Sequence, residues 1–466
     1  MRTLNYTAPH ICLVLVLALT PRAAWPDPAE SAPNQDDPPG EWQIIPFALP
    51  FGSSDVGNGA LGNVILTGPT ADGSGENTIF LSGAATDTGL NIFFAKGIFE
   101  RAGGWIFSGE LGLIADPKAA YFGRGNVQDL PEIQRVQEGR EPVPGSLPAS
   151  PTFIEGRDAS FNQRAANDFL INGDTAITPD ELNPGREVLR QQQNRYYSYS
   201  VRRQIASGAI QKWIGDLPFL ATLGFSGART RAYALGGDRE PGEFFANTTT
   251  LLELDQPIGF DENSPAVFSN TGLVGLEFNT LPEERDAHPN SGFRTGVRYE
   301  GAGRGTGSHY TYGRATAYHH HYLNLFESYF GQSGRELVLA HRAFAAQTFE
   351  DIPFFEEQGL GGVLLRGFPG NQFVDRVMLG GSLELRFTAF PASSPDGVSF
   401  GFLAFADSGR VAPTWHDVDH ECWHHAFGGG IDVNIGNKFA IELVIGKSRF
   451  QEFFILSEGH TLDLRD

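Results

Sequence analysis

The sequence predicts an all-β protein, a transmembrane antiparallel β-barrel, and three observations lead to that prediction. About fourteen segments alternate between apolar and polar residues, a secretory signal precedes them, and no later segment offers the ~20 uninterrupted apolar residues of a membrane-spanning helix. The chain has 57 Gly and 37 Phe but only two Met among its 466 residues, which favours strands, tight turns and aromatic belts. A soluble sandwich also alternates; the number of segments, the signal and the absence of a disulfide framework favour the barrel.

The N-terminus, residues 1–24, has the features of a signal peptide. Arg2 precedes an apolar run from Ile11 to Leu19, which is too short to span a bilayer. Its removal near Ala24 would also remove Cys12 and leave Cys422 as the single cysteine, which excludes an intramolecular disulfide. Residues 25–42 are rich in Pro and Asp and are expected to form a disordered leader. The barrel is therefore expected to occupy residues 43–466.

The charge of the expected mature chain excludes one class of partner. Without Arg2 and Arg22 the basic count falls from 34 to 32 against 55 acidic residues, so the net charge is near −23. Binding to nucleic acid rests on neutralising phosphates with basic side chains. We therefore expect no nucleic-acid partner, and the acidity fits exposed loops and a polar lumen.

The strand-like segments follow one another along nearly the whole chain. In one of them Val274, Leu276 and Phe278 oppose Gly275 and Glu277, as expected for an apolar outer face and a polar inner face. Single-chain barrels have an even number of strands, so fourteen or sixteen are admissible, with 90–100 the best candidate for an uncounted strand. The fourteen centres lie near residues 62, 80, 110, 200, 223, 275, 296, 315, 341, 382, 402, 430, 442 and 454.

Two long loops interrupt the strands. Residues 117–194 are polar and Pro-rich with little alternation, and residues 236–270 are similar. Because periplasmic turns of such barrels are short, both loops are expected outside the cell.

The stretch 359–387 combines a Gly-rich loop with a following strand. The loop carries Arg366, and in the strand Ser382, Glu384 and Arg386 share the polar face. In the next strand Phe405, Asp407 and Gly409 share the lumen face, and Gly409 leaves room where a side chain would block. An arginine can bind a carboxylate bidentately, so Arg366 and Asp407 are predicted to hold the loop inside the lumen. The alternative is a surface arginine and a lumen carboxylate that never meet.

These motifs resemble the BamA/TamA outer-membrane assembly superfamily, also called bacterial surface antigens. The resemblance rests on Leu-Arg-Gly-Phe at 365–368 and on the Phe405-x-Asp407-x-Gly409 strand. Further matches are the turn from Phe278 to Gly292 and the Tyr-Phe-Gly-Arg-Gly-Asn element at 121–126. The resemblance implies sixteen strands with an Arg-Gly-Phe loop inserted in the lumen. It also implies a latch formed by Arg366, Gly367, Phe368, Phe405, Asp407 and Gly409, with Glu384 as a second carboxylate partner.

The resemblance further implies a location in the outer membrane of a Gram-negative bacterium and a role in assembly or translocation of other molecules. Expected partners are outer-membrane lipid and unfolded outer-membrane proteins, or a separate periplasmic delivery protein, because the family's POTRA domains are not seen in this sequence. Asn279 stands where the family has an acid, and the last residues, 462–466, lack a terminal aromatic. No cofactor and no covalent chemistry are implied.

The sequence is also compatible with other functions. A pore whose lumen passes a solute and a surface protein that acts through 117–194 are the main alternatives. An enzyme is least supported, because no nucleophile–base pair or phosphate-cradling loop is visible.

Three segments have residue types that could bind metal, and none has a matching ligand spacing. Residues 416–425 contain four His, two Asp, one Glu and one Cys but match no zinc motif. In His319-His320-His321 at most two rings can share a face of a strand, and Asn172 to Glu181 lacks the acid spacing of a calcium loop. We expect no metal site, and a hydrated loop at 416–425.

Overall fold

The computed structural model describes the strands and many of their connections. It describes residues 42–53, 57–70, 75–121, 170–171, 175–176, 198–215, 217–234, 252, 256–261, 266–281, 288–326, 329, 333–392, 397–418, 423–435, 439–448 and 452–458. The predicted signal peptide, the predicted leader except Trp42, and most of the predicted loop 117–194 lie outside these residues.

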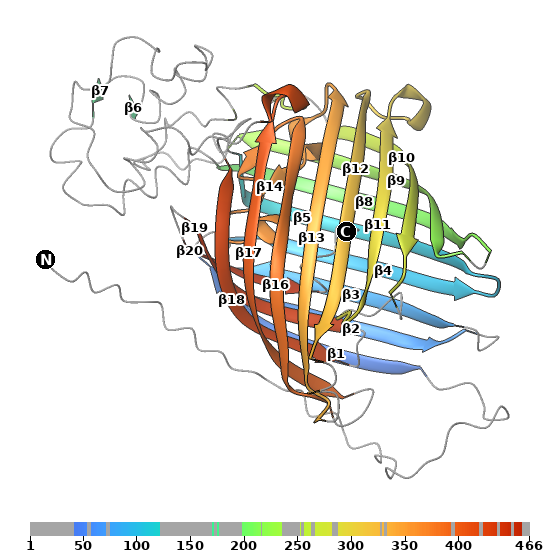
Figure 1. The fold of residues 1–466 in the computed structure, drawn as a ribbon. Helices are drawn as coiled ribbons and strands as arrows, with labels where there is room; N and C mark the ends of the chain where they lie inside the picture. Colours follow the sequence, from blue (N-terminus) through green and yellow to red (C-terminus); the bar gives the residue numbers. More distant parts are fainter. Residues whose placement is uncertain are drawn as a thin grey trace, which may run out of the picture.

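Sixteen strands form one antiparallel sheet in the described part of the chain, and each strand pairs with its neighbour in sequence (Figure 1). The sixteen strands predicted from the family resemblance are therefore confirmed. They are β1 (Gln43–Ser53), β2 (Gly57–Pro69), β3 (Glu76–Thr86), β4 (Asn91–Arg101), β5 (Trp105–Ala120), β8 (Ser198–Trp213), β9 (Phe219–Ala234), β10 (Val267–Asn279), β11 (Gly292–Ala302), β12 (Tyr312–Leu325), β13 (Glu336–Glu350), β16 (Val377–Phe390), β17 (Val398–Ala412), β18 (His424–Ile435), β19 (Phe439–Ser448) and β20 (Glu452–Glu458).

The two strands beyond the fourteen counted from alternation are β1 and β4. β4 coincides with the candidate at 90–100, and its pattern is blurred because Phe93 and Phe94 are adjacent and point to opposite faces. β5 continues to Ala120, past the predicted loop start at 117. The strand continues there through a register shift between Asp116 and Ala119, a bulge that accommodates Pro117.

The outer rows of the strands are apolar and exposed, whereas the inner rows are polar and buried. Leu223 is 62% exposed and Val274 53% exposed, in the rows predicted to face outward. Arg294, Arg342 and many other inward polar side chains are instead buried. Among the described residues, no helix has the length and apolar character needed to cross a bilayer. An apolar exterior around a charged interior is the arrangement of a membrane β-barrel.

The connections differ in length at the two ends of the barrel. One end, here called the long-loop rim, carries the longest connections, 121–197, 235–266 and 351–376, together with 413–423 and the shorter 54–56, 87–90, 303–311 and 449–451. The opposite end, the short-turn rim, carries 70–75, 102–104, 214–218, 280–291, 326–335, 391–397 and 436–438. The two predicted long loops thus leave the same rim.

Strands near the two ends of the sheet, β1 to β3 and β18 to β19, meet through apolar side chains. Ile65 of β2 and Ile441 of β19 belong to one buried cluster, with Ile45, Phe47, Phe80, Val433 and Ile435 packed against it. Ile441 belongs to the outer row of β19 but is only 6% exposed, because this cluster covers it. Side-chain burial therefore joins the two ends of the sheet.

Candidate functional site: the latch inside the barrel

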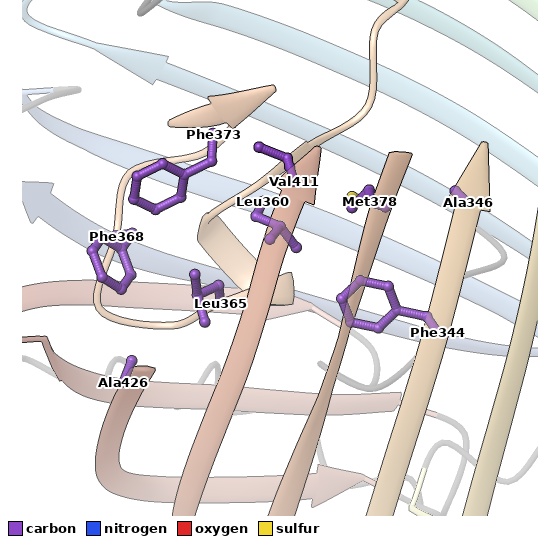
Figure 2. Close-up of a cluster of buried hydrophobic side chains, with 9 residues drawn as sticks. All are labelled: Phe344, Ala346, Leu360, Leu365, Phe368, Phe373, Met378, Val411 and Ala426. Carbon is purple, nitrogen blue, oxygen red and sulfur yellow. The ribbon is translucent and has the colours of Figure 1, made fainter. Parts of the chain in front are cut away.

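The connection between β13 and β16 places Arg366 inside the barrel. Within it, β14 (Gly359–Leu360) pairs with β15 (Phe373–Val374), so that the residues between them form a narrow loop. Figure 2 shows this loop beside Met378 of β16, Val411 of β17 and Ala426 of β18, which lie near the ends of these strands at the long-loop rim. Arg366 and Phe368 lie on the loop and are buried.

Arg366 binds both carboxylates named by the sequence. Its Nε donates to Oδ2 of Asp407 at 2.9 Å and its second terminal nitrogen donates to Oδ1 at 2.9 Å, which is a bidentate pair. The other terminal nitrogen donates to Glu384, and the side chains of all three residues are almost fully buried. The backbone N–H of Arg366 also donates to Asp407, at 2.9 Å. The carboxylate therefore fixes both the side chain and the backbone of the loop.

Ser382 and Phe405 complete the surroundings of the guanidinium. The Ser382 hydroxyl accepts from Arg366 at 2.8 Å and donates to Asp407. The guanidinium carbon lies 3.6 Å from the centroid of the Phe405 ring, a cation–π contact. Burial alone would lower the pKa of Arg366, but Glu384 and Asp407 raise it above its usual value. The two carboxylates therefore stabilise the charged form of the arginine.

An apolar cluster surrounds the charged contacts. Leu360, Leu365, Phe368 and Phe373 from the loop pack with Phe344, Ala346, Met378, Val411 and Ala426 from the barrel wall (Figure 2). Phe368 and Phe373 make an edge contact at 5.2 Å, and Phe373 stacks on His424 at 3.7 Å between centroids. This cluster excludes water from the ion pair, which strengthens it and makes any unpaired charge there costly.

Three glycines allow the loop to approach the wall. Gly367 has φ of +116°, a conformation that side chains rarely adopt. A Cβ at Gly409 would lie 2.9 Å from Leu360, as expected from the space predicted there. A Cβ at Gly446 of β19 would lie 2.5 Å from the backbone nitrogen of Gly367. Gly446 was not predicted from the sequence, because only the folded loop shows what it faces.

A second arginine of the wall also holds the loop and was not predicted. Arg342 of β13 is fully buried and donates to the carbonyl oxygens of Val363 and Leu364 at 3.2 and 3.1 Å. Alternation along β13 places Arg342 in an inner row, but its partners are backbone atoms, which no residue type reveals. The loop is therefore held by Arg342 on one side and by Asp407 and Glu384 on the other.

The turn between β10 and β11 forms a second inward segment, at the short-turn rim. Pro289 accepts from Arg386 at 2.8 Å, and His288 approaches Asp432 at 3.2 Å. Asn290 donates to Glu336 at 2.9 Å. We call residues 288–291 the strap, because these contacts tie it across the lumen to β13, β16 and β18.

The strap predicts a measurable role for Arg386. Arg386→Met leaves the buried Pro289 carbonyl without this charged donor, so we expect a loss of about 1.5–3 kcal/mol of stability. Urea unfolding followed by tryptophan fluorescence measures it. Arg376→Met, at an exposed arginine, is the matched control and should have no effect. Equal stability of both variants would show that the strap does not stabilise the barrel.

Asn279 stands where the family has an acidic residue, and its side chain contacts the carboxylate of Glu277. Its side chain donates to Glu277 at 3.0 Å and accepts from the backbone N–H of Leu281 at 2.9 Å. Tyr318 donates to the second oxygen of Glu277. The carboxylate at this point of the fold is thus Glu277.

The segments considered for metal binding have other contacts. Within the described ranges, no three His, Cys, Asp or Glu side chains come together in a way that could hold a metal ion. His424 stacks on Phe373, and His320 accepts from Arg294 in the lumen. Residues 419–422 and the segment 177–181 lie outside the described residues.

Together, the fold and the latch define a class: a membrane β-barrel with a loop seated in its lumen by a buried ion pair. The family model described as "Omp85 superfamily domain" matches residues 175–446, more than half of the chain. The chain belongs to the Omp85 superfamily, which confirms the family resemblance seen in the sequence.

Three solved structures are similar to the chain over 90% of its length. BamA from Haemophilus ducreyi lacking POTRA domains 1–3 has 14% identity and a TM-score of 0.47, with 70% of that chain covered. CdiB from Acinetobacter baumannii has 9% identity and a TM-score of 0.46, and CdiB from Escherichia coli has 12% and 0.48. The chain spans 59% and 61% of these two CdiB chains. No curated protein matches the chain.

Proposed function

We propose that the chain is an outer-membrane barrel of the Omp85 type that promotes assembly or translocation of other proteins without covalent chemistry. The observation that carries this proposal is the latch, in which Arg366 is buried against Asp407 and Glu384. A pore needs an open lumen, whereas the contacts of this loop with the barrel wall close part of the lumen. With the loop held in the lumen, the barrel wall is the surface through which the barrel can act on a client protein.

The orientation in the membrane follows from the connection lengths. Periplasmic turns of outer-membrane barrels are short and extracellular loops are longer, so we place the long-loop rim outside the cell. The strap then lies on the periplasmic side. The proposed location is the outer membrane of a Gram-negative bacterium, with lipid around the apolar outer rows.

The proposed clients are unfolded outer-membrane proteins, delivered from the periplasm by a separate protein or by the membrane itself. The second candidate function is a channel, and the charged inner rows of the barrel favour it, because a polar lumen is what a solute pathway requires. The two functions differ in the role of the loop, which assembly of clients would need and which would obstruct the flow of a solute through the lumen.

One experiment separates them. The barrel is reconstituted in liposomes, and both ion flux and the folding rate of a second barrel are measured in the same preparation. We expect faster client folding than in empty liposomes and little ion flux. Deletion of 361–372 is expected to raise the flux and to remove the acceleration. Flux from the intact barrel without any acceleration would favour the channel and overturn the proposal.

A further inference from the structure

A groove of about 520 Å³ runs along the outer face of β10 to β13. Its floor is made by Ala315, Ala317 and Ala345, and Val297 and Tyr299 form one wall. Pairing places Ala315 beside Tyr299 and Ala317 between Val297 and Ala345. The exposed fractions of Val297 and Tyr299 are 58% and 48%, so this face looks outward. We call this feature the alanine groove.

An aromatic side chain ends the groove toward the long-loop rim. Trp415 belongs to the connection between β17 and β18, yet its indole N–H donates to Oε1 of Gln347 on β13 at 2.7 Å. The Trp415 side chain therefore leans over the start of β16 onto the outer wall. Trp415 therefore closes the groove on the side of the long-loop rim.

Three histidines follow at the other end of the groove. His319 is the next outward residue after Ala317, and its ring centroid lies 6.0 Å from that of His321 and 5.9 Å from that of His341. Leu323 and Leu383, beside them in the same outward rows, are exposed. The Thr295 hydroxyl and Nδ1 of His319 are 2.6 Å apart. When the hydroxyl donates, the proton of a neutral ring lies on Nε2 and is directed away from the threonine.

The position of these histidines fits the boundary of the bilayer. Leu325, the last residue of β12, is the fourth residue after His321, which is ~13 Å along the strand and ~10 Å in height at the usual tilt. Polar side chains on a lipid-facing surface are costly and mark functional sites. Three of them side by side next to an apolar groove indicate a ligand with one polar and one apolar part.

We propose that the alanine groove and the three histidines bind one phospholipid, with an acyl chain in the groove and the phosphate on the imidazole N–H groups. Lipid surrounds this face if the chain spans the outer membrane as proposed above, and the inference rests on that location but not on the assembly activity. His319 and Ala315 are four residues, or ~13 Å, apart along β12, so an alkyl chain that starts at the histidines reaches Trp415. The phosphate would belong to the leaflet on the short-turn side.

The test counts lipids that stay on the purified barrel. Native mass spectrometry is done after titration with 1-palmitoyl-2-oleoyl-phosphatidylglycerol, and separately with 1-palmitoyl-2-oleoyl-glycerol, which lacks the phosphate. We expect the intact barrel to hold one phosphatidylglycerol and to bind it better than the diacylglycerol. Ala317→Leu fills the groove and should reduce occupancy by both lipids about tenfold.

Two further variants separate the parts of the site. His319→Leu with His341→Leu should lower phosphatidylglycerol occupancy to that of the diacylglycerol and leave diacylglycerol binding unchanged. Ala206→Leu, at an exposed alanine on the outer face of β8, is the matched control and should bind as the intact barrel does. Resistance to heat on a semi-native gel identifies variants that are folded.

Three outcomes would overturn the inference. They are a gradual uptake of many lipids without a distinct first one, equal occupancy in Ala317→Leu and Ala206→Leu, and a headgroup preference that survives loss of the histidines. None of these depends on whether the barrel assembles clients, so failure of this site and failure of the proposed function can be told apart.

Discussion

Arg366→Ala is expected to reduce the heat-resistant folded form of the barrel on a semi-native gel, with a loss of about 3–5 kcal/mol of stability. The variant leaves Asp407 and Glu384 buried without their cation, and an uncompensated buried charge is the costly result of breaking such a pair. Asp407→Asn should act in the same direction, because it removes the bidentate partner and leaves Arg366 with Glu384 alone.

The matched control is another arginine that pairs with a carboxylate nearer to solvent. Arg298 pairs with Glu300 and its side chain is 36% exposed, so Arg298→Ala should change stability by only ~0–1 kcal/mol. Replacing Arg366, Asp407 and Glu384 together by apolar residues should recover part of the stability lost in Arg366→Ala. Unchanged folding and unchanged conductance in both Arg366→Ala and Asp407→Asn would show that the latch does not stabilise the barrel.

Gly446→Val is expected to displace the loop although every charged group of the latch is still present. The added Cβ would lie 2.5–2.7 Å from the backbone of Arg366 and Gly367, and such contacts with backbone atoms cannot be relieved by a rotamer change. We expect loss of the heat-resistant form comparable to that of Arg366→Ala. Limited proteolysis should in addition cut the loop between Gly361 and Phe373, which is protected in the intact barrel.

Gly272→Ala is the control for this steric prediction. It also replaces a glycine of a barrel strand, but nothing lies within 4 Å of its new Cβ, so stability and proteolysis should be unchanged. If Gly446→Val is as resistant to heat and protease as Gly272→Ala, then the loop does not pack against β19 as described.

The strands and the charged core of the latch could be predicted from the sequence, because both follow from alternation. Side chains two apart share a face, which placed Glu384 and Asp407 in the lumen and made them available to Arg366. The family resemblance supplied the number sixteen, whereas the count from alternation lacked β1 and β4, and in β4 the adjacent Phe93 and Phe94 conceal the pattern. Because β4 has apolar residues in both its inner and its outer row, its sequence does not alternate clearly between apolar and polar residues.

The remaining contacts of the loop could not be predicted, because their partners are backbone atoms. Arg342 donates to carbonyls of the loop, and Gly446 matters only because the backbone of Gly367 lies against it. Arg386 was predicted on the polar face of its strand, but its contact with Pro289 needs the turn to fold inward. The position of a backbone atom depends on the whole fold, so it cannot be inferred from the residue types of the contacting segments.

The seating of the loop also couples strands that do not all touch one another. Arg342 binds it from β13, Glu384 and Asp407 from β16 and β17, and Gly446 abuts it from β19. In a close-packed interior such contacts tolerate only small shifts. The loop therefore fits only one curvature of the barrel wall between β13 and β19. A larger or smaller radius of this part of the barrel would break at least one of the loop's contacts.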